Sequence, residues 1–191
     1  EMARTGIFVR IFVCQVELVS SFWVPNLAGK VDVIPTRTNE MWFKADKAGV
    51  YYGQCAEFCG IAHALMRFRV IAEPTDSFEA WVKAQKAPPE PPEGLAAQGA
   101  ELFENESFAN RQQCVFCHAV ERMAIQGKVG PNLTHMASRT TIAAGIMENT
   151  SENLALWLKN PQAQKFGAKM PNLNLSDQQI EALVAYLQSL N

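Results

Sequence analysis

The amino-acid sequence predicts two domains, an antiparallel β-barrel or sandwich followed by an all-helical domain. Three observations carry this prediction. Short apolar runs rich in valine, isoleucine and aromatic residues fill most of the first 72 positions, and such residues pack well on a pleated sheet. A proline-rich segment then interrupts the chain. After it, apolar residues recur at the spacing of an amphipathic helix, and 191 residues are enough for two cores.

The predicted first domain covers residues 1–87 and consists mainly of short strands. The segment Gly6–Ile34 is rich in β-branched and aromatic residues and contains turn-forming dipeptides, so we expect short strands joined by turns. Three more strands are predicted at Met41–Ala45, Val50–Tyr52 and Leu65–Ala72, the last with alternating apolar and basic residues. Helix-forming residues from Thr75 to Lys86 predict one helix at the end of this domain.

Residues 88–94 are predicted to be a linker because Pro88–Gly94 is mostly proline, which cannot continue a helix or a central strand. The second domain, residues 95–191, is expected to begin with a helix over Leu95–Phe103 and to include a short helix over Asn153–Lys159. Ser176 and Gln179 have the spacing of a capping box, which predicts the start of a final helix. The apolar face of that helix contains Ile180, Leu183, Val184 and Leu187.

Charge and hydropathy exclude two classes of protein. The formal net charge of −2 and the lack of a basic cluster argue against a nucleic-acid-binding protein. The apolar run Gly6–Val24 contains Arg10 and Glu17, which are costly inside a membrane, so we interpret it as buried strand. The chain opens on Glu1 without a basic and apolar leader, and we expect any targeting segment or membrane anchor to lie outside these residues.

Cys114-Val115-Phe116-Cys117-His118 has the C-x-x-C-H spacing of a c-type haem attachment site. The two thiols would hold the haem covalently while His118 reaches the iron. The alternatives are a chance occurrence or a C-x-x-C redox pair. Met170, which precedes a proline in a polar loop, is predicted to be the second axial ligand, and a thioether there would raise the reduction potential.

Four soft ligands fall within a twelve-residue stretch of the first domain: Cys55, Cys59, His63 and Met66. Thiolate, imidazole and thioether donors together favour copper. The alternative is that the cysteines are small buried hydrophobic residues, which would not explain the histidine and methionine beside them. The remaining cysteine, Cys14, is expected to be buried packing.

Residues 95–191 resemble a class I cytochrome c, an all-helical fold in which the first and last helices cross. The resemblance rests on the C-x-x-C-H box and on the segment Gly130–Leu133, which packs against the haem in that family. It implies that the carbonyl of Pro131 accepts a hydrogen bond from Nδ1 of His118. His135, just beyond this segment, is expected to be a surface or haem-edge histidine rather than a ligand.

The first domain resembles subunit II of haem-copper cytochrome c oxidases, whose outer domain is a cupredoxin-like Greek-key barrel with a binuclear copper centre, CuA. Similarity extends over about residues 20–86. The matching motifs are Ser21–Pro25, Asn39–Phe43, Ala45–Lys47 and Gly53–Gly60. The fusion to a cytochrome c domain resembles oxidases whose subunit II carries its own haem. Trp23 and Trp42 are expected to pack near the copper, with electron tunnelling as the alternative role.

The resemblance implies a ligand set for two coppers. Cys55 and Cys59 would bridge both metals, His63 and the carbonyl of Glu57 would bind one, and Met66 would bind the other together with an earlier histidine. This chain has Ser20 at that earlier position. The side chain of Glu57 would reach toward a magnesium ion at the boundary with subunit I.

The function implied by the resemblance is electron transfer in a respiratory terminal oxidase, from the c-type haem through the copper site to a haem in subunit I. The chain would belong to an oxygen-reducing, proton-translocating enzyme without itself making or breaking substrate bonds. Its partners would be subunit I, other membrane subunits and a donor such as a cytochrome c or a quinol-oxidising complex. The complex would lie in the plasma (inner) membrane, with this domain on the periplasmic or outer face.

Ser20 keeps one alternative open: a subunit whose copper site is mononuclear or degenerate and serves as a scaffold or docking module, so that only the haem is redox-active. A further alternative is a freely diffusing two-centre electron carrier.

Overall fold

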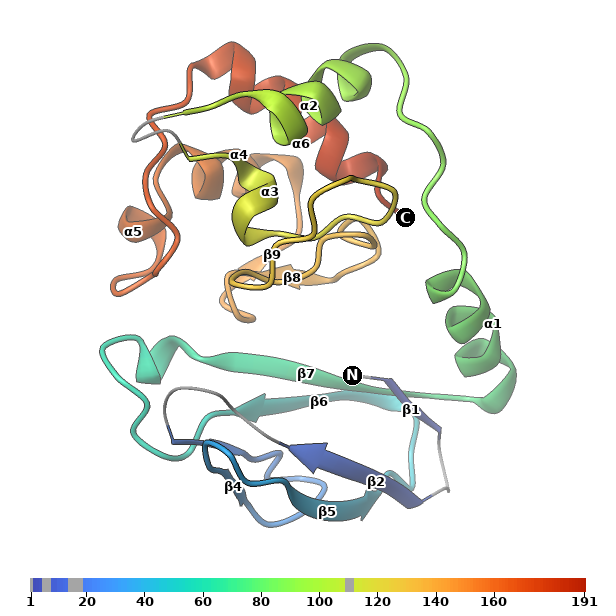
Figure 1. Ribbon diagram of the computed structural model, residues 1–191. Coiled ribbons are helices and arrows are strands. Elements are labelled where there is room, and N and C mark those ends of the chain that lie inside the picture. Colours follow the sequence, from blue (N-terminus) through green and yellow to red (C-terminus); the bar gives the residue numbers. More distant parts are fainter. Residues whose placement is uncertain (1, 5–7, 14–18, 109–111) are drawn as a thin grey trace. The chain divides into compact units, whose positions relative to one another are not determined.

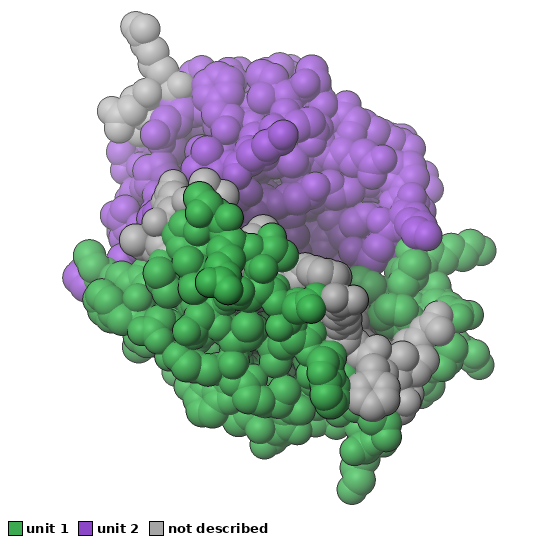
Figure 2. All heavy atoms as spheres, turned by 60° about the horizontal axis from the view of Figure 1, so that its bottom comes forward, with its two compact units in different colours: residues 1–83, 144–146 green, residues 84–143, 147–191 purple. Residues whose placement is uncertain are grey.

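The computed structural model describes residues 2–4, 8–13, 19–108 and 112–191. Cys14, predicted to be buried packing, lies outside this set. The chain divides into two compact units, coloured separately in Figure 2. Residues 1–83 with 144–146 form the first unit, and residues 84–143 with 147–191 form the second.

The first unit contains short strands, as predicted from its β-branched and aromatic residues. The strands are β1 (Met2–Arg4), β2 (Phe8–Val13), β3 (Ser20–Phe22), β4 (Val31–Val33), β5 (Asn39–Lys44), β6 (Gly49–Gln54) and β7 (Arg67–Glu73). A 3-10 helix, η1 (His63–Leu65), separates β6 from β7, and helix α1 (Thr75–Gln85) follows β7. The predicted strand Leu65–Ala72 therefore starts two residues later than expected, because Leu65 belongs to η1.

The strands pair as one three-stranded and two two-stranded sheets. The order in the larger sheet is β1-β7-β6, with β7 in the middle (Figure 1), and the smaller sheets are β2-β5 and β3-β4. β1 runs parallel to β7, with Met2 opposite Ile71, so the prediction of purely antiparallel pairing is wrong for this strand. Alternating side chains specify which face of a strand is buried, but they do not specify the direction of its neighbour.

Three residues form the buried core cluster of the first unit among the side chains that the structure describes. Val24, Phe43 and Val70 are almost fully buried, and partly buried Phe22 and Phe68 stack with ring centroids 4.6 Å apart. A bridge pairs Trp23 with Gln54.

Trp42 is 66% exposed, so its predicted packing role is wrong. Successive side chains of a strand point to opposite faces. Phe43 occupies the core face of β5 with 2% exposure, and its neighbour Trp42 takes the other face.

The second unit is mainly helical. Its helices are α2 (Gly94–Asn105), α3 (Cys114–Cys117), α4 (Ser151–Lys159), α5 (Pro161–Gln164) and α6 (Asp177–Ser189). The prediction of an all-helical domain needs one correction, since Thr141–Ile142 (β8) pairs with Met147–Glu148 (β9) in a short hairpin. Within the described parts of the chain, no helix is both long and apolar enough to cross a membrane.

The predicted capping box of the last helix is confirmed. Gln179 donates its backbone N–H to Oγ of Ser176 at 3.2 Å, and Oε1 of Gln179 accepts from the Ser176 N–H at 2.9 Å. Ile180, Leu183 and Leu187 are buried on the predicted apolar face.

Helices α2 and α6 pack closely, as labelled in Figure 1. A Cβ atom built on Gly99 would lie 2.0 Å from the backbone oxygen of Ala182 and 2.7 Å from Cβ of Tyr186. Only glycine therefore fits at this contact without movement of the helices. One turn later, the rings of Phe103 and Tyr186 meet edge to face at 5.6 Å. This contact anchors the core on which the C-x-x-C-H segment rests, because Val115 is buried in the same cluster.

Candidate metal and haem sites

A closed loop between β6 and β7 carries all four soft ligands. The N–H of Cys55 donates to the carbonyl of Met66 at 3.0 Å, which joins the two ends of the twelve-residue stretch. Inside it, the N–H of His63 donates to the carbonyl of Gly60 at 3.0 Å and η1 begins. Gly60 has φ +111, a backbone conformation that glycine adopts readily. The sequence therefore folds this loop mainly by short-range contacts.

The donor atoms converge inside the loop. Sγ of Cys59 lies 3.5 Å from Sγ of Cys55, 3.5 Å from Nδ1 of His63 and 3.5 Å from Sδ of Met66. Two ligands at about 2.3 Å from one metal in tetrahedral geometry lie about 3.7 Å apart. Cys55 and Cys59 are free thiols, and their separation is far longer than the bond of a disulfide. The arrangement fits a thiolate-rich metal site with copper-type donors.

Glu57 contributes two different groups to this region. Its carbonyl oxygen lies 3.0 Å from Sγ of Cys55, which is where a backbone ligand was predicted. Its carboxylate pairs with Nζ of Lys30 at 2.9 Å, and Lys30 also pairs with Asp32 at 3.1 Å. Hydrogen bonds to Glu57 and then Asp32 raise the pKa of Lys30. The magnesium ion expected at Glu57 stays a prediction, and the carboxylate already has a cationic partner.

Ser21, to which the sequence alone assigned no role, attaches β3 to the loop. Its Oγ accepts a hydrogen bond from the N–H of Ala56 at 2.7 Å, and its own N–H lies 3.5 Å from Sγ of Cys55. The neighbouring Ser20 is 3% exposed. Ser20 occupies the position where the resemblance implies a histidine ligand, and it offers a hydroxyl there. It lies next in sequence to Ser21, which contacts Cys55 directly.

Apolar side chains surround the exposed side of the loop. Phe58 and Ile61 are each about three-quarters exposed, and Met66 is 37% exposed. The ring of Phe58 lies 5.9 Å from that of His63. Cys55, by contrast, is 4% exposed. The loop therefore places its first thiol in the interior and its last two ligands near the surface.

The C-x-x-C-H segment forms a separate site in the second unit. Both thiols lie on the single turn of α3, with His118 as its C-cap. Nδ1 of His118 lies 2.8 Å from the carbonyl oxygen of Pro131, the distance of a hydrogen bond in which the carbonyl accepts. This contact leaves Nε2 as the ring nitrogen available to a metal. A Cβ on Gly130 would lie 2.5 Å from the His118 ring, so glycine lets the loop approach the imidazole closely.

Burial affects the ionisation of this segment. It raises the pKa of the Cys114 thiol to about 12, although the thiol's own backbone hydrogen bond opposes the shift. Burial lowers the pKa of His118, an effect that the Pro131 carbonyl opposes and the charge of Arg139 reinforces. Redox-active cysteines usually have depressed pKa values in electropositive surroundings. The environment of Cys114 thus disfavours the thiolate that a redox-active pair needs.

The remaining predicted residues lie nearby in the same unit. Met170 is half-buried and packs against the core cluster that also receives Cys114. His135 is half-buried, with Nε2 3.1 Å from the carbonyl oxygen of Gln85. Its Nδ1 is buried with no hydrogen-bond partner within the described chain. His135 is therefore less exposed than a surface histidine.

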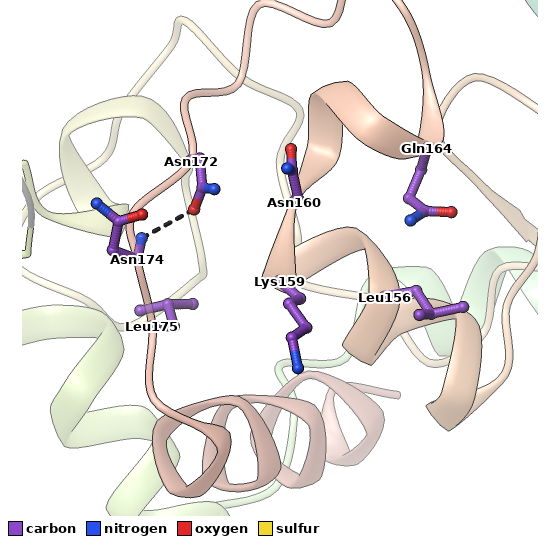
Figure 3. A pocket seen from close by; sticks show the side chains of 7 residues that line it. All are labelled: Leu156, Lys159, Asn160, Gln164, Asn172, Asn174 and Leu175. Atoms are coloured by element: carbon purple, nitrogen blue, oxygen red, sulfur yellow. Dashed lines mark hydrogen bonds between the residues drawn. The ribbon is translucent and has the colours of Figure 1, made fainter.

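A solvent-open pocket of about 540 Å³ lies elsewhere on the second unit (Figure 3). Its lining is rich in amides, and Oδ1 of Asn172 accepts a hydrogen bond from the N–H of Asn174 at 2.9 Å. The lining residues are Leu156, Lys159, Asn160, Gln164, Asn172, Asn174 and Leu175. None of the predicted haem ligands is among them, so this pocket is distinct from the C-x-x-C-H site.

Comparison with known protein families also divides the chain into two parts. Residues 4–73 match the family described as cytochrome c oxidase subunit II, periplasmic domain, and residues 96–191 match the cytochrome c family. Cytochrome c oxidase subunit 2 of Alkalihalophilus pseudofirmus is 45% identical over 176 residues, which are 91% of this chain and 49% of the relative. The subunit 2 of Bacillus sp. strain PS3 is 39% identical over 183 residues, 89% of this chain and 49% of the relative.

The chain spans about half the length of these curated relatives. Among solved structures, the periplasmic domain of subunit II of cytochrome oxidase from Bradyrhizobium japonicum is 36% identical. The match covers 44% of this chain and 62% of that chain, with a TM-score of 0.44. The relationship to this solved domain therefore rests on sequence identity and not on structural superposition.

Proposed function

The chain belongs to the family of cytochrome c oxidase subunit II, with a cytochrome c domain at its end, and from this premise we propose that it transfers electrons in a respiratory terminal oxidase. Electrons would pass from a c-type haem in the second unit through copper in the first to a haem in subunit I. The enzyme as a whole would reduce oxygen and translocate protons. This chain would make and break no substrate bonds itself. The observation that carries the proposal is the convergence of Cys55, Cys59 and His63, whose ligand atoms all lie within 4.8 Å of one another.

The proposed domain layout is a cupredoxin-like Greek-key barrel over residues 1–87, a linker over 88–94 and a cytochrome c domain over 95–191. The strands of the first unit and the helices of the second support it. Residues 88–93, between α1 and α2, have neither helical nor strand structure. Proline there keeps the connection extended.

Copper would be held by the thiolates of Cys55 and Cys59, by His63, by Met66 and by the Glu57 carbonyl. Copper held by these residues would supply a one-electron carrier. The protein contributes a preformed loop. Its ends are joined by the Cys55–Met66 backbone hydrogen bond, and Ser21 fixes its first turn to β3.

Haem would be held by thioether bonds from Cys114 and Cys117, with His118 and Met170 as axial ligands. The Pro131 carbonyl would fix the ring orientation of His118, as hydrogen bonds to the second nitrogen commonly do for metal-bound histidines. The hydrogen-bond distance of 2.8 Å supports this role.

The proposed partners are oxidase subunit I, other membrane subunits and an electron donor such as a cytochrome c or a quinol-oxidising complex. The proposed location is the plasma (inner) membrane complex, with this domain on the periplasmic or outer face. The match of residues 4–73 to a family described as a periplasmic domain supports this placement.

Ser20 favours a second candidate, in which the loop binds one copper or none and the first unit acts as a docking module. A neutral hydroxyl is a hard, weak ligand for a copper-thiolate site. Ser20 is buried beside the Ser21–Cys55 contact, so the metal that depends on Met66 would lack one ligand.

Metal analysis and EPR spectroscopy of the purified full chain separate the two candidates. A pair of coppers for each haem, with the hyperfine pattern of one electron shared between two nuclei, would support the binuclear proposal. A single copper would support the second candidate. Ser20→His tests the missing ligand directly, because we expect this change to restore a copper pair if its absence is the cause. Cys59→Ser is the matched control and should lose copper while keeping the covalent haem.

The haem assignment has its own test. Met170→Ala should leave the haem covalently attached and lower its reduction potential, since a thioether opposite histidine raises it. Potentiometry on the full chain measures the change. An unchanged potential would show that another residue is the second axial ligand.

A further inference from the structure

The solvent-open pocket of about 540 Å³ on the second unit, which we call the amide pocket, lies between two walls (Figure 3). One wall is formed by the end of α4, by Asn160 and by α5, and the other by Asn172–Leu175, which has neither helical nor strand structure. Of the seven described residues that line it, four are amides, one is a lysine and none is a carboxylate. Its volume suits a small organic molecule, and its lining favours a polar one.

Two of these amides, one on each wall, already use their oxygen. Oδ1 of Asn160 accepts the N–H of Ala163 at 3.1 Å, and Oδ1 of Asn172 accepts the N–H of Asn174 at 2.9 Å. Their Nδ2 groups, each a donor of two hydrogen bonds, have no acceptor among the residues that the structure describes. Aspartate would accept the same backbone N–H groups equally well, so the local turns alone do not require an amide at either position.

Lys159 adds a positive charge to the amide pocket. Its Nζ pairs with Oδ1 of Asp177 at 3.2 Å, and the two side chains are 64% and 90% exposed. Exposed ion pairs are weak, so Nζ of Lys159 is available to a second anion. Because Asp177 offsets part of the charge, the amide pocket favours a ligand with one negative charge over an ion with several.

Two leucines complete the lining of the amide pocket. Leu156 is 46% exposed, and Leu175 packs against the buried core of the unit. An apolar chain that covers them would remove apolar surface from water, which is favourable. The lining therefore combines hydrogen-bond donors, one cation and an apolar surface.

We propose that the amide pocket binds the carboxylate of a small organic acid that has an apolar chain. The carboxylate would accept hydrogen bonds from Nδ2 of Asn160, from Nδ2 of Asn172 and from Nζ of Lys159. A carboxylate has several acceptor sites, and its hydrogen bonds with cations are strong. The apolar chain would lie against Leu156 and Leu175. None of the predicted copper or haem ligands takes part, so this site does not depend on the proposed electron transfer.

The experiment follows the side-chain amide signals of Asn160 and Asn172 in proton–nitrogen NMR spectra of the full chain while sodium hexanoate is added. Hexanamide has the same chain without the charge, and sulfate has charge without a chain, so both serve as comparison ligands. Asn172→Asp is the test variant, because its carboxylate still accepts the Asn174 N–H but repels hexanoate. Gln162→Glu is the matched control. Gln162 is exposed and does not line the amide pocket, so this change adds the same charge nearby.

We expect hexanoate to shift both amide signals with a dissociation constant of about 1 mM, since the ligand is small and the amide pocket is open to solvent. Hexanamide and sulfate should bind about tenfold more weakly. Asn172→Asp should weaken hexanoate binding by about tenfold or more, the effect of losing one hydrogen bond to a charged group. Gln162→Glu should change it by about twofold at most, because salt screens exposed charges.

Three outcomes would overturn the inference. The first is that the amide signals of the wild type stay in place at tens of millimolar hexanoate. The second is that sulfate binds as tightly as hexanoate. The third is that Asn172→Asp and Gln162→Glu weaken binding equally, because the effect would then be one of charge alone. If Asn172→Asp does not fold, Asn160→Asp takes its place, and hexanoate binding as tight as that of the wild type contradicts the inference. Copper and haem contents of the same preparation test the proposed function separately.

Discussion

The two candidate sites are built in opposite ways. In the first unit, four predicted side-chain ligands fall within twelve residues, and one hydrogen bond between Cys55 and Met66 closes the loop that presents them. In the second unit, the predicted haem ligands lie at His118 and Met170, with Pro131 between them in the sequence. Their positions depend on a core built around the crossing of α2 and α6.

This difference predicts which substitutions should disrupt each site. A local loop should respond to changes in its own hydrogen bonds and be indifferent to the packing of the other unit. A site assembled from distant segments should respond to a clash at a helix crossing that contains none of its ligands. Four substitutions, taken from the largest expected effect to the smallest, test this contrast.

Gly99→Ala should destabilise the second unit by about 3 kcal/mol, the upper part of the usual range for overpacked cores. The added methyl group would meet the Ala182 backbone oxygen at 2.0 Å, and backbone cannot move aside as a side chain can. Urea unfolding, monitored by haem absorbance, measures the loss of stability. Copper binding should be unchanged.

Gly29→Ala is the control for that substitution, because no atom of the described residues lies within 4 Å of a Cβ at that position. It should leave both sites as they are. Equal stabilities of the two alanine variants would show that the α2–α6 crossing does not support the haem site.

Ser21→Ala should weaken the copper loop by about 1–2 kcal/mol, because the N–H of Ala56 would lose its acceptor and be left partly buried. Copper affinity, measured by competition with a chelator, should fall by about tenfold for each 1.4 kcal/mol. The haem potential should not change. An affinity equal to that of the wild type would mean that the loop holds its shape without β3.

Ser176→Ala should cost about 1 kcal/mol, the usual value of an N-cap side chain. It removes the hydrogen bond to the Gln179 N–H that starts α6. The loss should appear in the haem-monitored unfolding of the second unit, with no effect on copper affinity. Ser176→Asp is the matched control, since aspartate is also a good N-cap and should keep most of the stability.

Lys30→Met should have the smallest effect, because Lys30 pairs with Glu57 and Asp32 at the surface, where ion pairs are weak and screened by salt. The folded pKa of Lys30 is raised. The folding stability that comes from the raised pKa of Lys30 is therefore fully present below about pH 10.5, the ordinary pKa of lysine. It is lost as the pH rises through the higher pKa of the folded state.

An NMR titration of Nζ in Lys30 should give a pKa above its ordinary value at low salt, with the elevation shrinking in high salt. A value at the ordinary position would show that the pair is absent in solution. Because Lys30 pairs with the side-chain carboxylate of Glu57 and not with the carbonyl proposed to bind copper, copper affinity should be nearly unchanged in Lys30→Met.

Much of the fold was predictable because its signals are short-range. The capping box at Ser176 and Gln179 needs only the spacing of a single helical turn. Helix α4 was predicted from Asn153 and begins at Ser151, with the usual uncertainty at a helix end. The parallel pairing of β1 with β7 and the hairpin β8-β9 were not predictable, because partner choice depends on segments far apart in the chain or on backbone turns without a distinctive motif.

The candidate sites divide similarly. The spacing of Cys55, Cys59, His63 and Met66 predicted one set of soft ligands, and the structure brings their donor atoms together around Cys59. Metal binding by this set stays a prediction. The exposure of Trp42 was predicted wrongly, since its aromatic side chain favoured packing while strand alternation placed it opposite Phe43. Ser21 and Lys30 were missed because a serine or a lysine has no distinctive motif and reveals a role only when a distant partner such as Ala56 or Glu57 is in place.

By itself, the sequence determined the family, the two kinds of ligand cluster and the capped final helix, because each is encoded in residues within about one loop or one turn of each other. Only the tertiary structure decided which polar groups support those ligands. The carbonyl of Pro131 lies within hydrogen-bond distance of His118, and Ser21 contacts the loop that carries the predicted copper ligands. Such contacts join residues distant in sequence, so they exist only after the chain has folded.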